Sequence, residues 1–468
     1  MAASLEKVSE PTGTPGVVQR LSTFLERYGV ETHGIAPIPK EQRVDKRSYQ
    51  LFMLWFAANL NVSSLVYGAA GPVVFKLSLR DTAIILLITD IVSLIIPSYL
   101  VYGVVVPSIL NVLTMMGYLF FGVIVGGQFL AEVSDHLTPT SGIIVVALIS
   151  LAVSFCGYKL LHWFASLAWI PTVIGLAVML GVGGKHLAHT QVSYPPPTVA
   201  SVLSFAATIA AGNLSWCTMT ADYGVYHDAD GSSAMIFTYT YLGMFLPTLV
   251  MASLGAAFAT AAPGVPSWNA GYDHGNNLGG LVSAILAPCG WFGKFLLASM
   301  ALSMSAANAP TVYSFGMSVM NISVVFARIQ RYVFAIVATA ICTPLAVVGQ
   351  TRFYDAFVAG LDIIGYWSAS YAGIILTEHV LFRRRDFARY KLDDWDDAKK
   401  MPPGVAALLT FCGSFALVVP CMNQRFFVGP VAKAGTGDIG LVVGFFGACV
   451  LYGVLRAVEI RLFSGHTS

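Results

Sequence analysis

The chain has 468 residues, of which 56% are hydrophobic and only 11% charged, and its formal net charge is +2. Because soluble domains carry about 25% charged residues, this chain has too little polar surface to cover itself in water. Its length suffices for about twelve spans of roughly 20 apolar residues with short loops. The composition predicts an all-α polytopic membrane protein, and the small net charge argues against a nucleic-acid partner.

Polar and charged residues fill the first 48 positions, and no cleavable signal peptide is visible. We expect residues 1–48 to form a cytoplasmic tail, residues 49–463 one transmembrane domain, and residues 464–468 a short C-terminal tail. The seven cysteines show neither metal-ligand spacing nor a disulfide framework. They are interpreted as apolar packing residues, and we expect neither a metal nor another cofactor.

Apolar runs bounded by glycine, proline or charged residues predict about twelve membrane-spanning helices. The eighth run is longer than a bilayer needs, and we expect it to include a surface segment before Trp291. The predicted ranges are Tyr49–Val74, Leu79–Tyr102, Val105–Glu132, Ser141–Tyr158, Trp163–Gly181, Thr198–Ala221, Ala234–Ala261, Leu281–Ser318, Tyr332–Val348, Tyr354–Phe382, Gly404–Pro420 and Gly437–Ile460.

The distribution of lysine and arginine predicts the orientation of these spans. Four basic residues between Lys40 and Arg47 precede the first span, and five between Arg383 and Lys391 follow the tenth. The loops at 134–140 and 263–280 have none. Twelve spans place both basic clusters on one side of the membrane, so the N- and C-termini are predicted to be cytoplasmic.

The first predicted span contains polar and helix-breaking residues. Asn59 and Asn61 lie within it, and amides that face lipid without partners are costly. Gly68, Gly71 and Pro72 follow them and are expected to permit a break in the helix. Because irregular backbone at membrane depth is tolerated only where it lines a cavity or is buried in protein, this span is predicted to face a central site.

The sixth predicted span repeats this pattern, with Gly212, Asn213 and Ser215 beside Trp216. Broken helices at corresponding positions of two halves indicate the central site of a transporter. The first and sixth spans are five spans apart, which predicts two inverted repeats of five helices. The alternative is that these small residues only pack ordinary helices against each other.

Further candidates lie in the second, sixth, eighth and tenth spans. Asn308, which precedes Pro310, can present its amide to a cavity or form an interhelical hydrogen bond. Asp90 and Asp362 are intramembrane acids, interpreted either as proton-coupling groups or as protonated acids between helices. Asp222, at the inner end of the sixth span, is interpreted either as a gating residue or as a solvated acid.

These residues suit a site for a neutral planar ring, which needs an aromatic face for stacking and amides for recognition of its edge. The sequence contains no nucleotide-binding loop, no nucleophile motif and no cluster of His or Cys residues. Those absences argue against an enzyme or a primary pump and favour a secondary transporter.

Several motifs together resemble those of one known family. They are the N-x-N run of the first span, GGQFLAEVS at Gly126–Ser134, TADYGVY at Thr220–Tyr226, ANAPTVYS at Ala307–Ser314, IGYWSASYAGIILTEHVLFRR at Ile364–Arg384 and QRFFVGPVA at Gln424–Ala432. From about Leu25 to Phe463, the chain resembles the fungal purine–cytosine permeases, a branch of the nucleobase:cation symporters. The resemblance implies a LeuT-like fold, location in the plasma membrane and proton-coupled import of cytosine, adenine, guanine or hypoxanthine.

The resemblance also assigns roles to individual residues. It implies that Trp216 stacks on the base, that Asn308 contributes an amide and that Tyr118 contributes a second aromatic ring. By position in sodium-using relatives, Ser303 is the candidate hydroxyl of a cation site between the first and eighth spans. A small nucleobase and the lipid bilayer are the expected partners, and the oligomeric state is left open. The complete predicted substrate-binding set is Trp216, Asn308, Tyr118, Asn59, Asn61 and Ser215.

The chain departs from the family pattern at three places. Gly122 stands where the family often has an amide, and Thr311 stands where it usually has an asparagine. The run from Ser98 to Gly103 leads straight into the third span, so about 20 residues of the family's basic connection between the second and third spans are missing. Two alternatives therefore stay open, a pyridoxine-like vitamin permease and a relative that does not transport.

Overall fold

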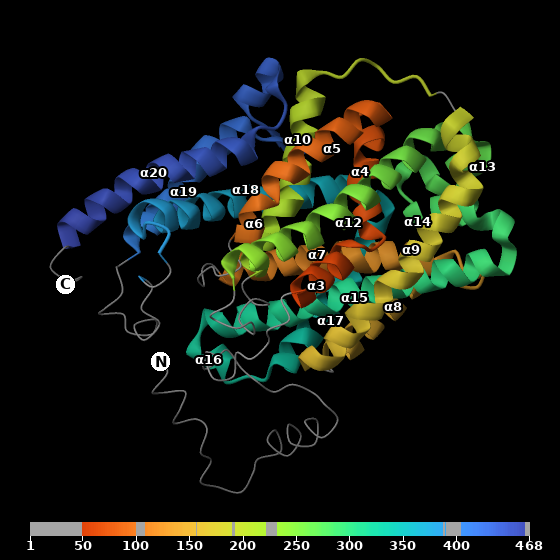
Figure 1. The fold of residues 1–468 in the computed structure, drawn as a ribbon, viewed down its shortest axis with the longest axis horizontal. Helices are drawn as coiled ribbons and strands as arrows, with labels where there is room; N and C mark the ends of the chain where they lie inside the picture. The colour runs from red at the N-terminus through yellow and green to blue at the C-terminus, as the bar shows by residue number, and fades with distance from the viewer. Residues whose placement is uncertain are drawn as a thin grey trace, which may run out of the picture.

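The computed structural model describes residues 49–99, 108–155, 157–189, 192–220, 232–386, 389 and 404–463. These residues form a bundle of helices with one short hairpin (Figure 1). The helices are α3 (Tyr49–Asn59), α4 (Ser63–Val73), α5 (Leu79–Ser93), α6 (Ile95–Tyr99), α7 (Ser108–Ala131), α8 (Pro139–Phe155), α9 (Gly157–His189), α10 (Val199–Ser215), α12 (Ser233–Ala261), α13 (Pro266–Tyr272), α14 (Leu278–Leu286), α15 (Gly290–Ile322), α16 (Val324–Ala327), α17 (Arg331–Gly349), α18 (Phe353–Thr377), α19 (Val405–Val418) and α20 (Gly440–Phe463).

Several of these helices have the length and apolar character of membrane spans. Within the described residues, eight helical segments are long and apolar enough to cross a bilayer, and a ninth if the bent pair α3 and α4 is one span. Shorter apolar helices cover Pro139–Phe155 and Val405–Cys421. Each predicted segment overlaps at least one described helix, which confirms the all-α membrane architecture, whereas the number of crossings stays a prediction.

The first span is broken, but not where the sequence indicated. α3 ends at Asn59, α4 begins at Ser63, and the two helices meet at an angle of 51°. The predicted break at Gly68–Pro72 is wrong, because these residues lie within α4. A Cβ atom on Gly68 would lie 1.6 Å from the carbonyl oxygen of Ala252, so this glycine permits close packing of α4 against α12.

The sixth span is a regular α-helix through Gly212 and Asn213. α10 continues to Ser215, and the backbone tightens into the 3₁₀ helix η3 (Trp216–Thr218). The change of helix type at Trp216 lies beside the polar residues that indicated a break in this span. Residues 221–231 lie outside the described residues, so the second broken helix stays a prediction.

The eighth and fifth predicted segments can also be compared with the observed helices. The eighth segment divides before Trp291, since η6 (Ala287–Cys289) separates α14 from α15, whose first residue, Gly290, has a φ of +53°. The location of the part before Trp291 at the membrane surface stays a prediction. The predicted end of the fifth helix at Gly181 is wrong, because α9 continues to His189. A glycine inside a helix costs only about 1 kcal/mol relative to alanine, which packing against neighbouring helices offsets.

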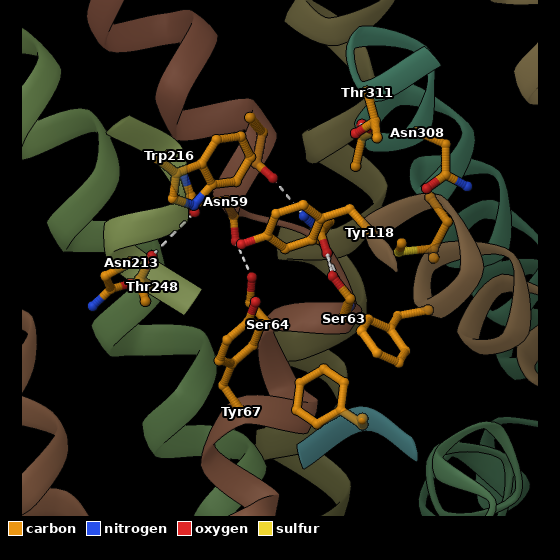
Figure 2. A pocket seen from close by; sticks show the side chains of 17 residues that line it. Asn59, Ser63, Ser64, Tyr67, Tyr118, Asn213, Trp216, Thr248, Asn308 and Thr311 are labelled. Atoms are coloured by element: carbon orange, nitrogen blue, oxygen red, sulfur yellow. Dashed lines mark hydrogen bonds between the residues drawn. The ribbon is translucent and has the colours of Figure 1, made fainter. Parts of the chain in front are cut away.

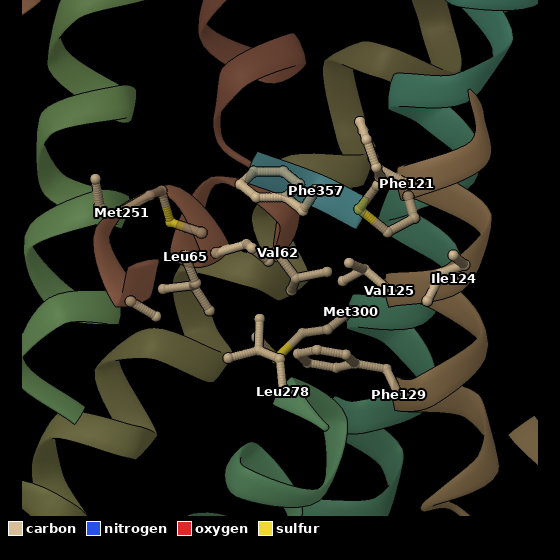
Figure 3. Close-up of a cluster of buried hydrophobic side chains, with 14 of the residues drawn as sticks. Val62, Leu65, Phe121, Ile124, Val125, Phe129, Met251, Leu278, Met300 and Phe357 are labelled. Carbon is tan, nitrogen blue, oxygen red and sulfur yellow. The ribbon is translucent and has the colours of Figure 1, made fainter. Parts of the chain in front are cut away.

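Tertiary packing brings the broken first span to the centre of the bundle. α4 packs against α12, and α7 packs against α15. α18, α19 and α20 lie together at one side (Figure 1). Beneath the break, an apolar layer joins α4, α7, α14, α15 and α18 (Figure 3). Its side chains include Leu65, Phe121, Phe129, Leu278 and Phe357.

A short hairpin that the sequence did not predict follows α19 and η11 (Val419–Cys421). β1 (Asn423–Gln424) pairs with β2 (Phe427–Val428) in antiparallel register. The hairpin directs Gln424, which is only 4% exposed, into the bundle between α18 and the start of α20. Gln424 therefore joins the hairpin to α18 and to the start of α20, both of which contact α10.

Candidate functional site

One cavity lies at the break between α3 and α4 (Figure 2). Its walls come from the broken first span, α7, α10 with η3, α12, α15 and α18. The residues that line it are Ala58, Asn59, Asn61, Ser63, Ser64, Tyr67, Tyr118, Phe121, Gly122, Asn213, Trp216, Thr248, Met304, Ala307, Asn308, Thr311 and Phe357.

Two asparagine side chains form hydrogen bonds to the backbone around the break. The Nδ2 of Asn59 donates to the carbonyl of Trp55 at 2.9 Å, and the Nδ2 of Asn61 donates to the carbonyl of Ala58. The Oδ1 of Asn61 accepts from the backbone N–H of Ser63, the first residue of α4, at 2.9 Å. The two contacts of Asn61 replace helical hydrogen bonds that the break removes, whereas Asn59 binds a carbonyl inside α3. Both asparagines therefore hold the backbone beside the cavity that they line.

Trp216 and Tyr118 form the aromatic wall of the cavity. Their rings stack with centroids 5.6 Å apart and planes 22° from parallel. The hydroxyl of Tyr118 donates to the carbonyl of Gly212 at 2.9 Å and is hydrogen bonded to the hydroxyl of Ser215. Ser215 does not line the cavity; it fixes the position of Tyr118. Trp55 packs edge-on against the indole, with centroids 5.4 Å apart.

α15 supplies Asn308 and Thr311 to the cavity (Figure 2). The Nδ2 of Asn308 donates to the hydroxyl of Ser150 on α8 at 3.3 Å. A Cβ atom on Gly122 would lie 2.0 Å from the Oδ1 of Asn308, so the absence of a side chain at position 122 lets this amide approach α7. Gly122 and Thr311, which depart from the family pattern, therefore both lie at the cavity itself.

The buried acid Asp90 is connected to the cavity through one residue. Its Oδ1 accepts from the Nδ2 of Asn213 at 2.8 Å, and Asn213 lines the cavity. Asp90 itself is 0% exposed. Asn213 lies in the polar run of the sixth span but is not one of the predicted site residues. Its position one helical turn before Trp216 was the signal that could have identified it.

Other candidates lie away from the cavity. The carboxylate of Asp362 accepts from the hydroxyl of Thr208 and from the amide of Gln424, each at 2.8 Å, outside the lining residues. Ser303 is buried within α15, donates to the backbone carbonyl three residues earlier, and does not line the cavity. Asp222 lies outside the described residues.

Several lining residues had no signal in the sequence. Tyr67 and Thr248 lie in ordinary apolar stretches of α4 and α12, and only the fold brings them together. Five predicted residues, Asn59, Asn61, Tyr118, Trp216 and Asn308, do line the one cavity. Their contact with a substrate stays a prediction.

The lining defines what this cavity can hold. None of its seventeen residues carries a charged side chain, whereas aromatic rings, amides and hydroxyls all face it. The space in the cavity that the centres of water molecules can occupy is about 60 Å³. A single water needs about 10–15 Å³ by that measure. The cavity therefore suits a small, neutral molecule with an aromatic face and a polar edge.

The fold matches solved structures of membrane transporters. The inward-facing conformation of Mhp1 matches with a TM-score of 0.65 at 16% identity, covering 94% of this chain and 97% of that one. A closed conformation of Mhp1, a nucleobase-cation-symport-1 family transporter with bromovinylhydantoin bound, matches with a TM-score of 0.62 at 16% identity, covering 92% and 96%. A Na+-coupled sialic acid symporter matches with a TM-score of 0.60 at 12% identity, covering 93% and 94%. The LeuT-like fold, which these solved membrane transporters share, is confirmed.

The sequence comparison then identifies the family. The model of the permease family for cytosine/purines, uracil, thiamine and allantoin matches residues 37–100 and 97–409. The chain belongs to this family. The two matched segments overlap at residues 97–100, next to the predicted shortened connection between the second and third spans.

Curated relatives cover almost the whole chain. The purine-cytosine permease fcyB of Emericella nidulans is 31% identical over 95% of this chain and 91% of its own length. The purine-cytosine permease FCY2 of Saccharomyces cerevisiae is 30% identical, over 94% and 88%. The vitamin B6 transporter TPN1 of Saccharomyces cerevisiae is 26% identical, over 99% and 94%.

Proposed function

We propose that the protein imports cytosine and purine bases across the plasma membrane together with a proton. Two relatives at 31% and 30% identity are purine-cytosine permeases, and the family description includes cytosine and purines. The observation that carries the proposal is an uncharged cavity that joins the indole of Trp216 to the amides of Asn59, Asn213 and Asn308.

The cavity walls favour a free base over its nucleotide. A base needs a stacking partner and neutral hydrogen-bonding groups, and stacking on an aromatic residue contributes about 1–3 kcal/mol per base. A phosphate instead needs cationic or strongly donating partners, which are absent from the lining residues. Burying that anion among neutral walls would be strongly unfavourable.

The ring pair at the wall constrains how the base binds. Trp216 and Tyr118 are only 5.6 Å apart between ring centroids. A third ring between them needs about 7 Å, twice the contact distance of roughly 3.5 Å between carbon atoms. The base therefore stacks on an open ring face, or the two rings separate when it enters.

Proton coupling is proposed from a buried polar network outside the cavity. The Nε2 of Gln424 lies 2.8 Å from the Oδ2 of Asp362, 2.8 Å from the hydroxyl of Tyr366 and 3.2 Å from the Oδ2 of Asp438. An amide nitrogen has two hydrogens and cannot donate to all three acceptors. Neither acid takes part in an ion pair among the described residues. A proton on one carboxyl removes the repulsion between two buried acids.

Asp362 is the acid to which we assign the transported proton. Asp438 also accepts from the backbone N–H groups of Asn423 and Gly440, at 2.7 and 3.0 Å, next to the N-terminus of α20. Those donors and the helix dipole stabilise its charged form. Asp362 accepts from the side chains of Thr208 and Gln424, and it lies in the interior of α18, away from a helix N-terminus. Asp90, buried beside the cavity, is the second candidate.

The proposed location is the plasma membrane, with both termini in the cytoplasm. The basic residues that flank the first span and follow the tenth support this orientation through the positive-inside rule. A tag at either terminus should be protected from external protease in intact cells, and digestion there would reverse the orientation.

Two alternatives have specific support. The similarity to a vitamin B6 transporter favours a pyridoxine-like substrate. The shortened connection at residues 97–100 favours a relative that binds a base without transporting it.

Uptake of radiolabelled cytosine into permease-deficient cells tests the proposal against both alternatives. We expect uptake that unlabelled adenine and hypoxanthine inhibit, that pyridoxine does not inhibit, and that collapse of the proton gradient abolishes. A chain with a family-length connection restored after residue 97 serves as the matched comparison. Uptake of pyridoxine in place of cytosine, or binding of cytosine without uptake in this chain, would overturn the proposal.

A further inference from the structure

Asn213 lies between the cavity and a buried acid. It is on α10, one helical turn before Trp216, and is 4% exposed. Its Nδ2 donates to the Oδ1 of Asp90 at 2.8 Å and to the hydroxyl oxygen of Ser93 at 2.9 Å. Both partners are on α5, so this amide joins the second span to the wall of the cavity.

The contacts around Ser93 determine which way the amide of Asn213 points. The hydroxyl of Ser93 donates its single hydrogen to the carbonyl of Thr89 at 2.7 Å. Ser93 can therefore only accept from Asn213, which requires the amide nitrogen on that side. An ionised Asp90 also only accepts. Both hydrogens of the Asn213 amide are thus used toward α5.

With its nitrogen held on α5, Asn213 has only its carbonyl oxygen left for the cavity. No hydrogen bond to this Oδ1 is present among the described residues, and Asn213 belongs to the cavity lining. Residues one turn apart on a helix share a face, so this acceptor lies beside the indole of Trp216. A ring stacked there would place its edge near the oxygen.

We propose that the Oδ1 of Asn213 accepts a hydrogen bond from an N–H group of the base, and that Asp90 is the positioning residue that holds it in this orientation. This inference rests on the proposed function and deepens it. It predicts a substrate with a hydrogen-bond donor on its edge, because an acceptor-only edge would face the oxygen of Asn213 without a hydrogen between them.

The role of Asp90 follows from its surroundings. It is 0% exposed, and its Oδ2 has no hydrogen-bond partner among the described residues. Its contact with Asn213 is therefore the interaction through which it acts on the cavity. Replacing it with asparagine keeps an oxygen that can accept from Asn213, whereas leucine removes the acceptor and keeps a similar volume.

Competition between cytosine and methylated analogues tests the acceptor. Radiolabelled cytosine uptake is measured against unlabelled cytosine, 1-methylcytosine and N4,N4-dimethylcytosine, which lack the ring N–H and the amino hydrogens respectively. For the native chain we expect at least one analogue to bind more weakly than cytosine by a factor of about ten or more, because it loses one buried hydrogen bond. Asn213→Leu, similar in volume, should reduce that difference to less than about threefold for the same analogue.

Variants at Asp90 and Asn213 distinguish a positioning role of Asp90 from a general effect on the structure. Asp90→Asn should preserve the discrimination between cytosine and the analogue, and Asp90→Leu should lose it. Where Asn213→Leu does not reach the cell surface, Asn213→Thr replaces it, because its hydroxyl can still donate to Asp90 but no amide oxygen remains in the cavity. Equal discrimination in the native chain and in either Asn213 variant would overturn the inference. No cytosine uptake by the native chain would instead overturn the proposed function.

Discussion

Trp216 is the residue on which the proposed site depends most, because it supplies the stacking face. Trp216→Ala should raise the apparent KM for cytosine about 5- to 150-fold, the equivalent of roughly 1–3 kcal/mol of stacking. Trp216→Phe, which keeps an aromatic face, should have a smaller effect. Initial uptake rates over a range of cytosine concentrations measure both, with surface expression determined in parallel.

A tryptophan outside the site provides the matched control. Trp291, at the start of α15, is 80% exposed and does not line the cavity. Trp291→Ala should leave the apparent KM unchanged. An unaltered KM in Trp216→Ala, or an equal increase in both variants, would contradict the assignment of Trp216.

The residues of the cavity differ in how far the sequence could identify them. Asn59, Trp216 and Asn308 could be identified because a polar or aromatic group amid small residues is conspicuous in an apolar span. Tyr118 came only from the family resemblance. Tyr67 could not be found at all, since a tyrosine in an apolar helix gives no indication of which neighbours it will meet.

Close packing of α4 against α12 explains why the break in the first span does not lie at the glycines that predicted it. Glycines were read as weak points in the helix, yet Gly68 and Gly255 each place bare backbone against the partner helix. The break instead lies where Asn61 bonds both to the end of α3 and to the start of α4. Small residues in membrane helices permit approach as readily as they permit bending.

This packing yields a prediction for α4. In Gly68→Ala, the new Cβ would lie 1.6 Å from the carbonyl oxygen of Ala252, so α4 and α12 must separate. Overpacking of this kind costs about 1–3 kcal/mol. We expect less protein at the cell surface and a lower melting temperature in detergent, measured by surface labelling and by a thermal assay.

Gly184 on α9 is the matched control for that variant. No atom lies within 4 Å of a Cβ atom placed there. Gly184→Ala should be neutral or slightly stabilising, because alanine favours a helix by about 1 kcal/mol over glycine. A Gly68→Ala protein as stable as Gly184→Ala would show that the two helices adjust without strain.

In the whole molecule, α10 links the cavity to the proposed proton site. Asn213 faces the cavity from this helix, and Thr208 of the same helix donates to Asp362 at 2.8 Å. Asn213 follows Thr208 by five positions, which corresponds to a rise of about 7.5 Å along the helix axis. The N–H of Asp438, just before α20, also donates to the hydroxyl of Ser204 on α10 at 2.8 Å. One rigid helix thus contacts both the base site and the acids.

Because the base site and Asp362 share α10, neutralising this acid should uncouple uptake from the proton gradient. In Asp362→Asn the residue cannot exchange a proton, so it resembles the protonated acid at every pH. Cytosine uptake by the native chain should rise as external pH falls, whereas uptake by Asp362→Asn should vary little with external pH.

Asp355→Asn is the control, since this exposed acid near the start of α18 pairs with Arg425 at the surface, where such pairs contribute little. A pH response that persists in Asp362→Asn but disappears in Asp90→Asn would move the proton site to the second span. A response that persists in both variants would exclude both acids.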